Sequence, residues 1–234
     1  MTTHVLRVWL PDRPGALGAV ASRIGAVRGD LVGIDILERG AGRAIDELVV
    51  QLPSDDLVPL LVSEVSEVDG VDVEDVRPLH DTGFDARAHS LETAAALVEQ
   101  GSVRELLDLL VRHVRQDYDA DWVVVVGADG AEAVAQGSEG VAGGGDVPPA
   151  SWLRAFVVGS GASAQLNAAD CGPDDVAWAE LPAVGRTLVL GREGRPLRAR
   201  ERRQLLAVAR IAGARWRELA AANGHLGPAS LSAT

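Results

Sequence analysis

The residues best suited to chemistry lie in a short turn near the N-terminus, where an apolar stretch gives way to Pro, Asp, Arg and Gly. The run that ends at Leu10 predicts a buried strand, and Pro11 and Pro14 stop it because proline lacks an N–H and fixes φ. Apolar residues then recur at helical spacing from Leu17 onward, so the turn abuts a helix N-terminus whose first amides have no partner within the helix. Gly15 allows a ligand to approach the backbone closely. We therefore expect the turn to accept a carboxylate; an ordinary connection that binds nothing is the alternative.

The same turn carries a family pattern. The run Asp12-Arg13-Pro14-Gly15-Ala16-Leu17 reads D-R-P-G-x-L and resembles the ACT domain, a regulatory module that commonly binds amino acids. The resemblance spans roughly the first third of the chain. It implies a ligand site with one wall at this turn and another at the opening of the second strand. The ligand-binding residues implied are Asp12, Arg13, Pro14, Gly15, Ala16, Leu17, Asp30, Leu31 and Val32.

Two details of this site are specific to the chain. Asp12 or Asp30 would form an ion pair with a ligand's ammonium group. The alternative, which is commoner for carboxylates in turns, is that both are simply solvated. Many amino-acid-binding ACT domains have a polar asparagine at or beside the position of Leu31, which argues here against a polar amino acid as the ligand.

Other residue types that often carry chemistry are sparse. We expect no metal site and no cofactor, because the histidines are scattered along the chain and structural or solvated roles fit them better. The single cysteine, Cys171, has acidic neighbours that disfavour a reactive thiolate. The run Gly159 to Ala164 matches G-x-G-x-x-A, but no βαβ unit follows it, so a dinucleotide site is not expected. The five histidines are His4, His80, His89, His113 and His225.

Charge and composition exclude further classes. The formal net charge is −12, which disfavours general binding to nucleic acids or anionic membranes. Every basic residue is arginine, so the chain has neither a phosphate-binding P-loop lysine nor a Schiff-base lysine. No apolar run reaches the roughly 18 residues that a membrane span needs, and we expect a cytoplasmic protein. The closing helix is locally basic, which leaves an unidentified protein partner open.

Hydrophobic periodicity predicts the strands and helices that position the turn at Asp12 to Leu17. Residues 4–78 predict the order strand, helix, strand, strand, helix, strand. The second strand is expected at Leu31 to Glu38, the third at Arg43 to Leu52, and the second helix from Asp55 or Asp56. This βαββαβ order predicts an α+β, ferredoxin-like domain: a four-stranded antiparallel sheet with both helices on one side. The ACT resemblance agrees, and implies a homodimer with ligand pockets at the pair interface.

The rest of the chain predicts a second α+β domain, with an antiparallel sheet flanked by helices. Its ending is similar to a GAF domain: the strand pair within Leu181 to Gly191, the turn at Arg195-Pro196-Leu197, and a long helix. The expected helices are Leu91 to Gln100, Val103 to Asp117, Ser151 to Phe156 and Arg198 to Ala221. The expected strands are Asp121 to Val126, Ala131 to Gln136, Trp178 to Leu181 and Arg186 to Leu190.

Together these patterns predict an ACT-like domain at residues 1–79, a linker at 80–90, a GAF-like domain at 91–222 and a flexible tail at 223–234. The function we expect is that of a non-enzymatic regulator or sensor. Its first domain would bind a small amino acid or related carboxylate, and its second would transmit the bound state or dimerise. The alternative is a structural or protein-interaction module without a small-molecule ligand. An enzyme would need a nucleophile, base or metal cluster that the sequence does not assemble.

Overall fold

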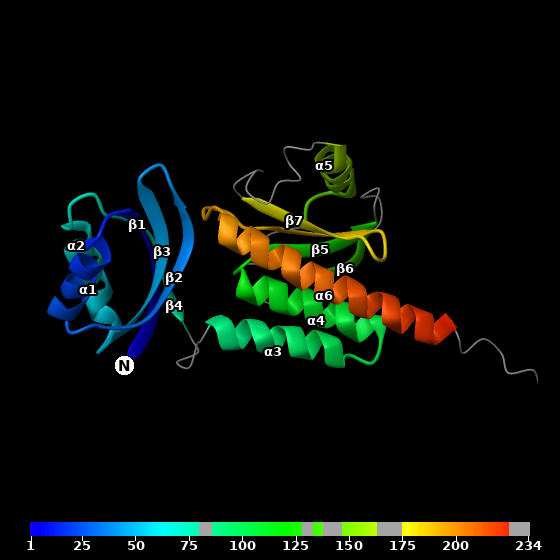
Figure 1. Cartoon of the computed structure of the whole chain (residues 1–234), viewed down its shortest axis with the longest axis horizontal. Helices are drawn as coiled ribbons and strands as arrows, with labels where there is room; N and C mark the ends of the chain where they lie inside the picture. The colour runs from blue at the N-terminus through cyan, green and yellow to red at the C-terminus, as the bar shows by residue number, and fades with distance from the viewer. Residues whose placement is uncertain (80–85, 128–132, 138–146, 163–174, 225–234) are drawn as a thin grey trace, which may run out of the picture. The chain divides into compact units, whose positions relative to one another are not determined.

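The computed structural model describes residues 1–79, 86–127, 133–137, 147–162 and 175–224, which form two compact units (Figure 1). Unit 1 is Met1–Ala88 and unit 2 is His89–Thr234. Helix α3 begins at Ala86, so part of the expected linker at 80–90 is helical, while residues 80–85 lie outside the described residues. No helix in the described ranges is both long enough and apolar enough to cross a membrane.

Unit 1 has the strand and helix order expected from its periodicity. Its sheet is antiparallel throughout and runs β2-β3-β1-β4, the split βαβ arrangement. A short 3₁₀ turn at Asp55–Leu57 precedes α2, with proline in the first turn of that helix, where a missing amide costs little. The elements are β1 (Thr2–Pro11), α1 (Ala16–Ala26), β2 (Asp30–Gly40), β3 (Arg43–Leu52), α2 (Val58–Ser66) and β4 (Asp72–Leu79).

Alternation along the strands directs one apolar face toward the two helices. Val20 and Ile24 of α1 and Leu61 and Val65 of α2 are fully buried against that face, and each pair is spaced four residues apart. The helices therefore cover one side of the sheet (Figure 1). The strand residues of this core are Leu6, Val8, Leu10, Leu48, Val50 and Leu52.

The other face of this sheet carries a charged cluster. Glu47 Oε1 accepts from Arg7 Nη2 at 2.8 Å and lies 2.9 Å from Arg77 Nη2. Burial acts to raise the pKa of the Glu47 carboxyl, but the guanidinium groups of Arg77 and Arg7 outweigh burial, and the pKa lies below its ordinary value. Three neighbouring strands are thereby joined through one carboxylate.

Unit 2 is built on a second antiparallel sheet, ordered β6-β5-β8-β7. This confirms the coarse expectation of an α+β chain with antiparallel sheets and helices. Three helices exceed their predicted bounds: α3 starts earlier, α5 continues past Phe156 to Ala162, and α6 continues past Ala221 to Gly224, into the segment expected to be a flexible tail. The elements are α3 (Ala86–Glu99), α4 (Val103–Asp117), β5 (Trp122–Gly127), β6 (Ala133–Gly137), α5 (Ala150–Ala162), β7 (Val176–Leu181), β8 (Arg186–Gly191) and α6 (Ala199–Gly224).

Helices cover both faces of the second sheet (Figure 1). Val123 and Val125 of β5 pack into the core shared with α4 and α6, whereas Trp122 and Val124 pack with α5 on the opposite face. This explains why β5 is an uninterrupted apolar run, since both of its faces are buried.

Candidate functional site

The predicted turn between β1 and α1 adopts the geometry that only glycine takes readily. Gly15 is the N-cap of α1 with φ of 88°, in the left-handed region, and no side chain of the described residues caps the helix. Asp12, Arg13, Pro14 and Gly15 are all exposed. The turn is therefore open to a ligand, and the absence of a Cβ at Gly15 keeps its backbone accessible.

Several amides at this turn have no backbone acceptor among the described residues. Asp12 N donates to Gly42 O at 2.9 Å, and Arg13 N donates to Pro11 O at 2.8 Å. Within the described part of the chain, no backbone carbonyl accepts from the amides of Gly15, Leu17 or Gly18. The first turn of α1 also contains no acidic residue. These free N–H groups and the positive end of the helix dipole together favour an anion at this position.

A buried carboxylate lies near this turn. Asp46 is on β3, where it pairs with Val8 of β1, and its residue is only 4 % exposed. Among the described residues, none forms a hydrogen bond with its Oδ1 atom. Burial raises the pKa of the Asp46 carboxyl, Arg39 counteracts this, and the nearby charge of Asp12 raises it further. A cation placed between Asp46 and Asp12 would relieve both penalties.

Sequence reasoning missed Asp46, although a signal for it exists. Ala44, Leu48, Val50 and Leu52 alternate along β3 on the helix-covered face, and Asp46 is the polar residue that interrupts them. A carboxylate on an otherwise apolar strand face costs stability unless it has a partner or a function.

The second predicted wall lies elsewhere in the same copy. Asp30, at the start of β2, pairs with Gln51, which lies beside Thr3. The turn instead follows Pro11, at the other end of β1. The two predicted walls therefore sit at opposite ends of one sheet, and one copy of unit 1 does not bring them together. Asp30 and Val32 are exposed and Leu31 is half-buried.

The strand that begins with this wall forms an edge of the sheet. Val32, Ile34 and Ile36 of β2 remain 49, 48 and 38 % exposed. On its other side β2 pairs with β3, and no further strand in the described ranges covers the edge. The exposed apolar side chains at this edge of the sheet suit contact with another chain.

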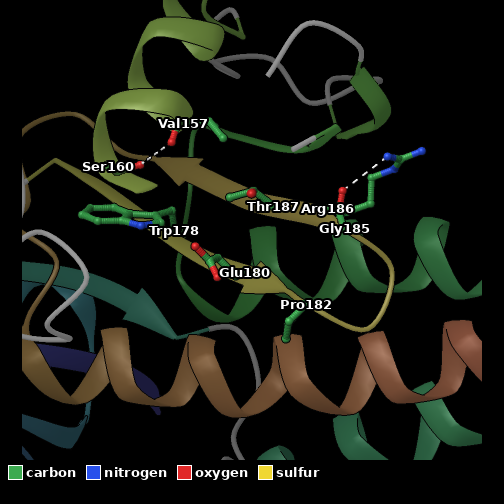
Figure 2. A pocket seen from close by; sticks show the side chains of 8 residues that line it. All are labelled: Val157, Ser160, Trp178, Glu180, Pro182, Gly185, Arg186 and Thr187. Atoms are coloured by element: carbon green, nitrogen blue, oxygen red, sulfur yellow. Dashed lines mark hydrogen bonds between the residues drawn. The ribbon is translucent and has the colours of Figure 1, made fainter. Parts of the chain in front are cut away.

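Unit 2 contains a small hollow between α5 and the sheet (Figure 2). Its volume is about 200 Å³, below the roughly 300 to 1,000 Å³ of ordinary ligand pockets. Ser160 Oγ donates to Val157 O at 3.2 Å, so its hydroxyl proton is already engaged. Polar and apolar side chains share the lining, which comprises Val157, Ser160, Trp178, Glu180, Pro182, Gly185, Arg186 and Thr187.

The remaining sequence candidates separate into three groups. Gly159 to Ala162, the first part of the G-x-G-x-x-A run, is the end of helix α5, and the rest of the run lies outside the described residues. Cys171, His80 and His225 lie outside the described residues. His89 and His113, in contrast, are not scattered: their ring centroids are 6.4 Å apart and Asp117 lies beside them. The i, i+4 spacing of His113 and Asp117 is the signal that sequence reasoning passed over.

Neither a protein-family model nor a curated protein sequence matches this chain. Three solved structures that resemble it share little sequence with it. The ACT domain of a GTP pyrophosphokinase from Chlorobium tepidum is 18 % identical, with a TM-score of 0.28 over 33 % of this chain and 97 % of that one. An unknown protein from Galdieria sulphuraria is 13 % identical, with a TM-score of 0.30 over 56 and 75 %. A formyltetrahydrofolate deformylase from Pseudomonas putida KT2440 is 14 % identical, with a TM-score of 0.27 over 40 and 37 %.

Proposed function

We propose that unit 1 is an ACT-like regulatory domain that binds a small amino acid or a related carboxylate between two copies of the chain. The observation that carries the proposal is the adjacency of two complementary features, the free amides at the start of α1 and the carboxylate pair of Asp46 and Asp12. An amino acid presents both a carboxylate and an ammonium group, and these two features suit one charge each.

The amides account for the anionic half of the ligand. Gly15, Leu17 and Gly18 supply N–H donors at the positive end of α1, and their main-chain positions do not depend on side-chain rotamers. The side chain of Arg13 is 61 % exposed and lies 3.5 Å from Asp69, an arrangement that leaves it available to a ligand at little cost.

The acidic pair accounts for the cationic half. Asp46 is buried with an unsatisfied oxygen, and the charge of Asp12 disfavours its ionisation. An ammonium group would supply a donor for Asp46 Oδ1 and, together with Arg39, a positive charge beside the two carboxylates. This assignment adds Asp46 to Asp12, one of the two residues expected from the sequence to meet the ammonium.

A second copy would complete the site. If β2 pairs antiparallel with its counterpart about a twofold axis, the start of one β2 lies beside the end of the other. Gly40 at the end of β2 pairs with Arg43, which pairs with Pro11. The partner's Asp30 would therefore come to the same end of the sheet as Gly15. The exposed apolar residues of β2 supply a reason for such pairing.

Under this proposal the chain is a sensor and not an enzyme. Unit 2, with the antiparallel sheet and long closing helix that a GAF-like domain would have, transmits the ligand state or holds two chains together. Binding alters an equilibrium between chain arrangements only as far as the ligand prefers one of them.

The second candidate is an interaction module without a ligand, in which the apolar edge of β2 serves only to pair chains. The same half-exposed residues, Val32, Ile34 and Ile36, favour it. The two candidates differ in whether an amino acid binds to the chain with a measurable heat and raises its melting temperature.

Calorimetry of the full chain with each common amino acid at millimolar concentration tests the proposal. Asp46→Asn should weaken binding by about tenfold or more, which corresponds to about 1.4 kcal/mol. Asp56→Asn, at an exposed position of the 3₁₀ turn, is the matched control and should leave affinity unchanged. The absence of heat or thermal shift with every amino acid would leave the interaction module as the better account.

A further inference from the structure

Unit 2 holds a group of metal-ligating side chains that the proposed function does not use. One potential ligand atom each from His89, His113 and Asp117 lies within 4.8 Å of the other two. His89 belongs to α3, whereas His113 and Asp117 lie one turn apart on α4 and so project from the same face. Two consecutive helices thereby present three ligands, two imidazoles and one carboxylate, of the types that transition metals favour.

The helices that carry these residues are firmly placed. Ser102 caps α4 by accepting from Glu105 N at 3.2 Å, and Ser102 Oγ donates to Glu105 Oε2 at 2.9 Å. Leu97 of α3 and Leu110 of α4 are fully buried in the same core. Only side-chain adjustments are thus needed to move the ligand atoms from their present separations to the roughly 3.3 Å expected around a tetrahedral ion.

One of the ligands already has an orienting partner. Thr93 Oγ1 lies 3.2 Å from His113 Nδ1, and Thr93 is only 2 % exposed. When Nδ1 donates to this hydroxyl, Nε2 is left unprotonated with its lone pair available. A hydrogen bond to the non-ligating nitrogen is the usual way in which proteins fix a metal-binding histidine.

The other two proposed ligands, His89 and Asp117, are in direct contact. His89 Nε2 and Asp117 Oδ1 are 2.6 Å apart, the distance of a strong hydrogen bond. The Asp117 side chain is 8 % exposed and that of His89 is 31 % exposed, so the carboxylate is held inside while the imidazole reaches solvent. An ion entering from solvent would replace the proton shared between them.

We propose that His89, His113 and Asp117 bind a divalent transition-metal ion, of which zinc fits best. Two imidazoles and one carboxylate match zinc, nickel or copper, whereas calcium and magnesium prefer sites made of oxygen atoms alone. Three protein ligands leave a fourth position for water or for an exogenous ligand. Such an ion would link α3 to α4.

The test uses the untagged full chain after treatment with a chelator, titrated with zinc chloride by calorimetry and, separately, with cobalt chloride by visible absorption. We expect one ion per chain and, for cobalt, the intense d–d bands of a four-coordinate site. His89→Gln, His113→Ala and Asp117→Asn should each lower zinc affinity by more than about tenfold, and Thr93→Val by about tenfold. Asp108→Asn, on an exposed part of α4, should leave zinc affinity unchanged.

Circular dichroism separates loss of the site from loss of the fold. His89→Gln is the most informative variant, because its side chain is partly exposed and its replacement leaves the buried core intact. Zinc binding that persists in this variant and in Asp117→Asn would overturn the proposal, as would a chain that binds calcium or magnesium equally well. Neither result depends on whether unit 1 binds an amino acid.

Discussion

Replacing Gly15 with alanine tests the backbone geometry on which the candidate site depends. An added Cβ meets no atom of the described residues within 4 Å, so no steric overlap with them is expected. The cost comes from φ of 88°, which an L-residue adopts at a penalty of about 1 to 2 kcal/mol. We therefore expect Gly15→Ala to lower the free energy of unfolding of unit 1 by about that amount while the fold is retained.

Gly18→Ala is a matched control within the same helical turn. It also has open space around its missing Cβ, but its φ is not positive. There alanine restricts the unfolded chain and favours the helix, so we expect a gain of about 0.4 to 1 kcal/mol. Both substitutions replace one Cα hydrogen with a methyl group, yet their effects on the free energy of unfolding should be opposite in sign and differ by about 2 kcal/mol.

Hydrogen exchange followed by mass spectrometry is the appropriate assay. A two-unit chain does not necessarily unfold in one transition, so a single melting temperature would mix the two units. Peptides from β1 and β3 report on unit 1 alone. Equal effects of Gly15→Ala and Gly18→Ala would refute the argument from the left-handed backbone, and with it the accessible amides at this turn.

Three further outcomes are expected. Glu47→Gln leaves Arg7 and Arg77 without their shared carboxylate and should destabilise unit 1 by about 3 to 5 kcal/mol in denaturant unfolding, whereas Glu38→Gln should change little. Because the folded pKa of Glu47 lies below its ordinary value of 4.5, its stabilisation is present above that pH and is lost as pH falls through the folded pKa. Acid titration of Glu47→Gln should lack that part of the slope. Gly191→Ala would place a Cβ against the indole of Trp122 and should destabilise unit 2 by about 1 to 3 kcal/mol or more, measured by exchange in β5 and β8 peptides.

Much of the fold was predictable because it rests on local regularities. The alternation in β3 predicts a strand, and the four-residue spacing of Val20 and Ile24 predicts a helix. The apolar faces of these two elements are buried in one core. The bounds of α5 were missed because Gly159 favours a break, whereas the helix continues through Val157 and Ser160, which are buried. Tertiary packing there outweighs the low helix propensity of glycine.

The candidate sites were less predictable, because they depend on contacts between distant parts of the chain. The turn at Gly15 could be found from sequence, since proline and glycine act locally. The role proposed for Asp46 depends on the burial of β3 and on its proximity to Asp12, which no local pattern contains. His89 and His113 meet only because α3 and α4 pack together, and the 24-residue separation hides this in the sequence.

The placement of the two predicted walls at opposite ends of one sheet has a genetic consequence. In the proposed pairing, each ligand site takes its turn from one chain and its strand opening from the other. A chain defective at Gly15 and a chain defective at Asp30 would each form homodimers with no working site. When the two variants are mixed, half of the sites in a mixed dimer combine an intact turn with an intact strand. Two inactive alleles would therefore complement one another, because each mixed dimer retains one working ligand site.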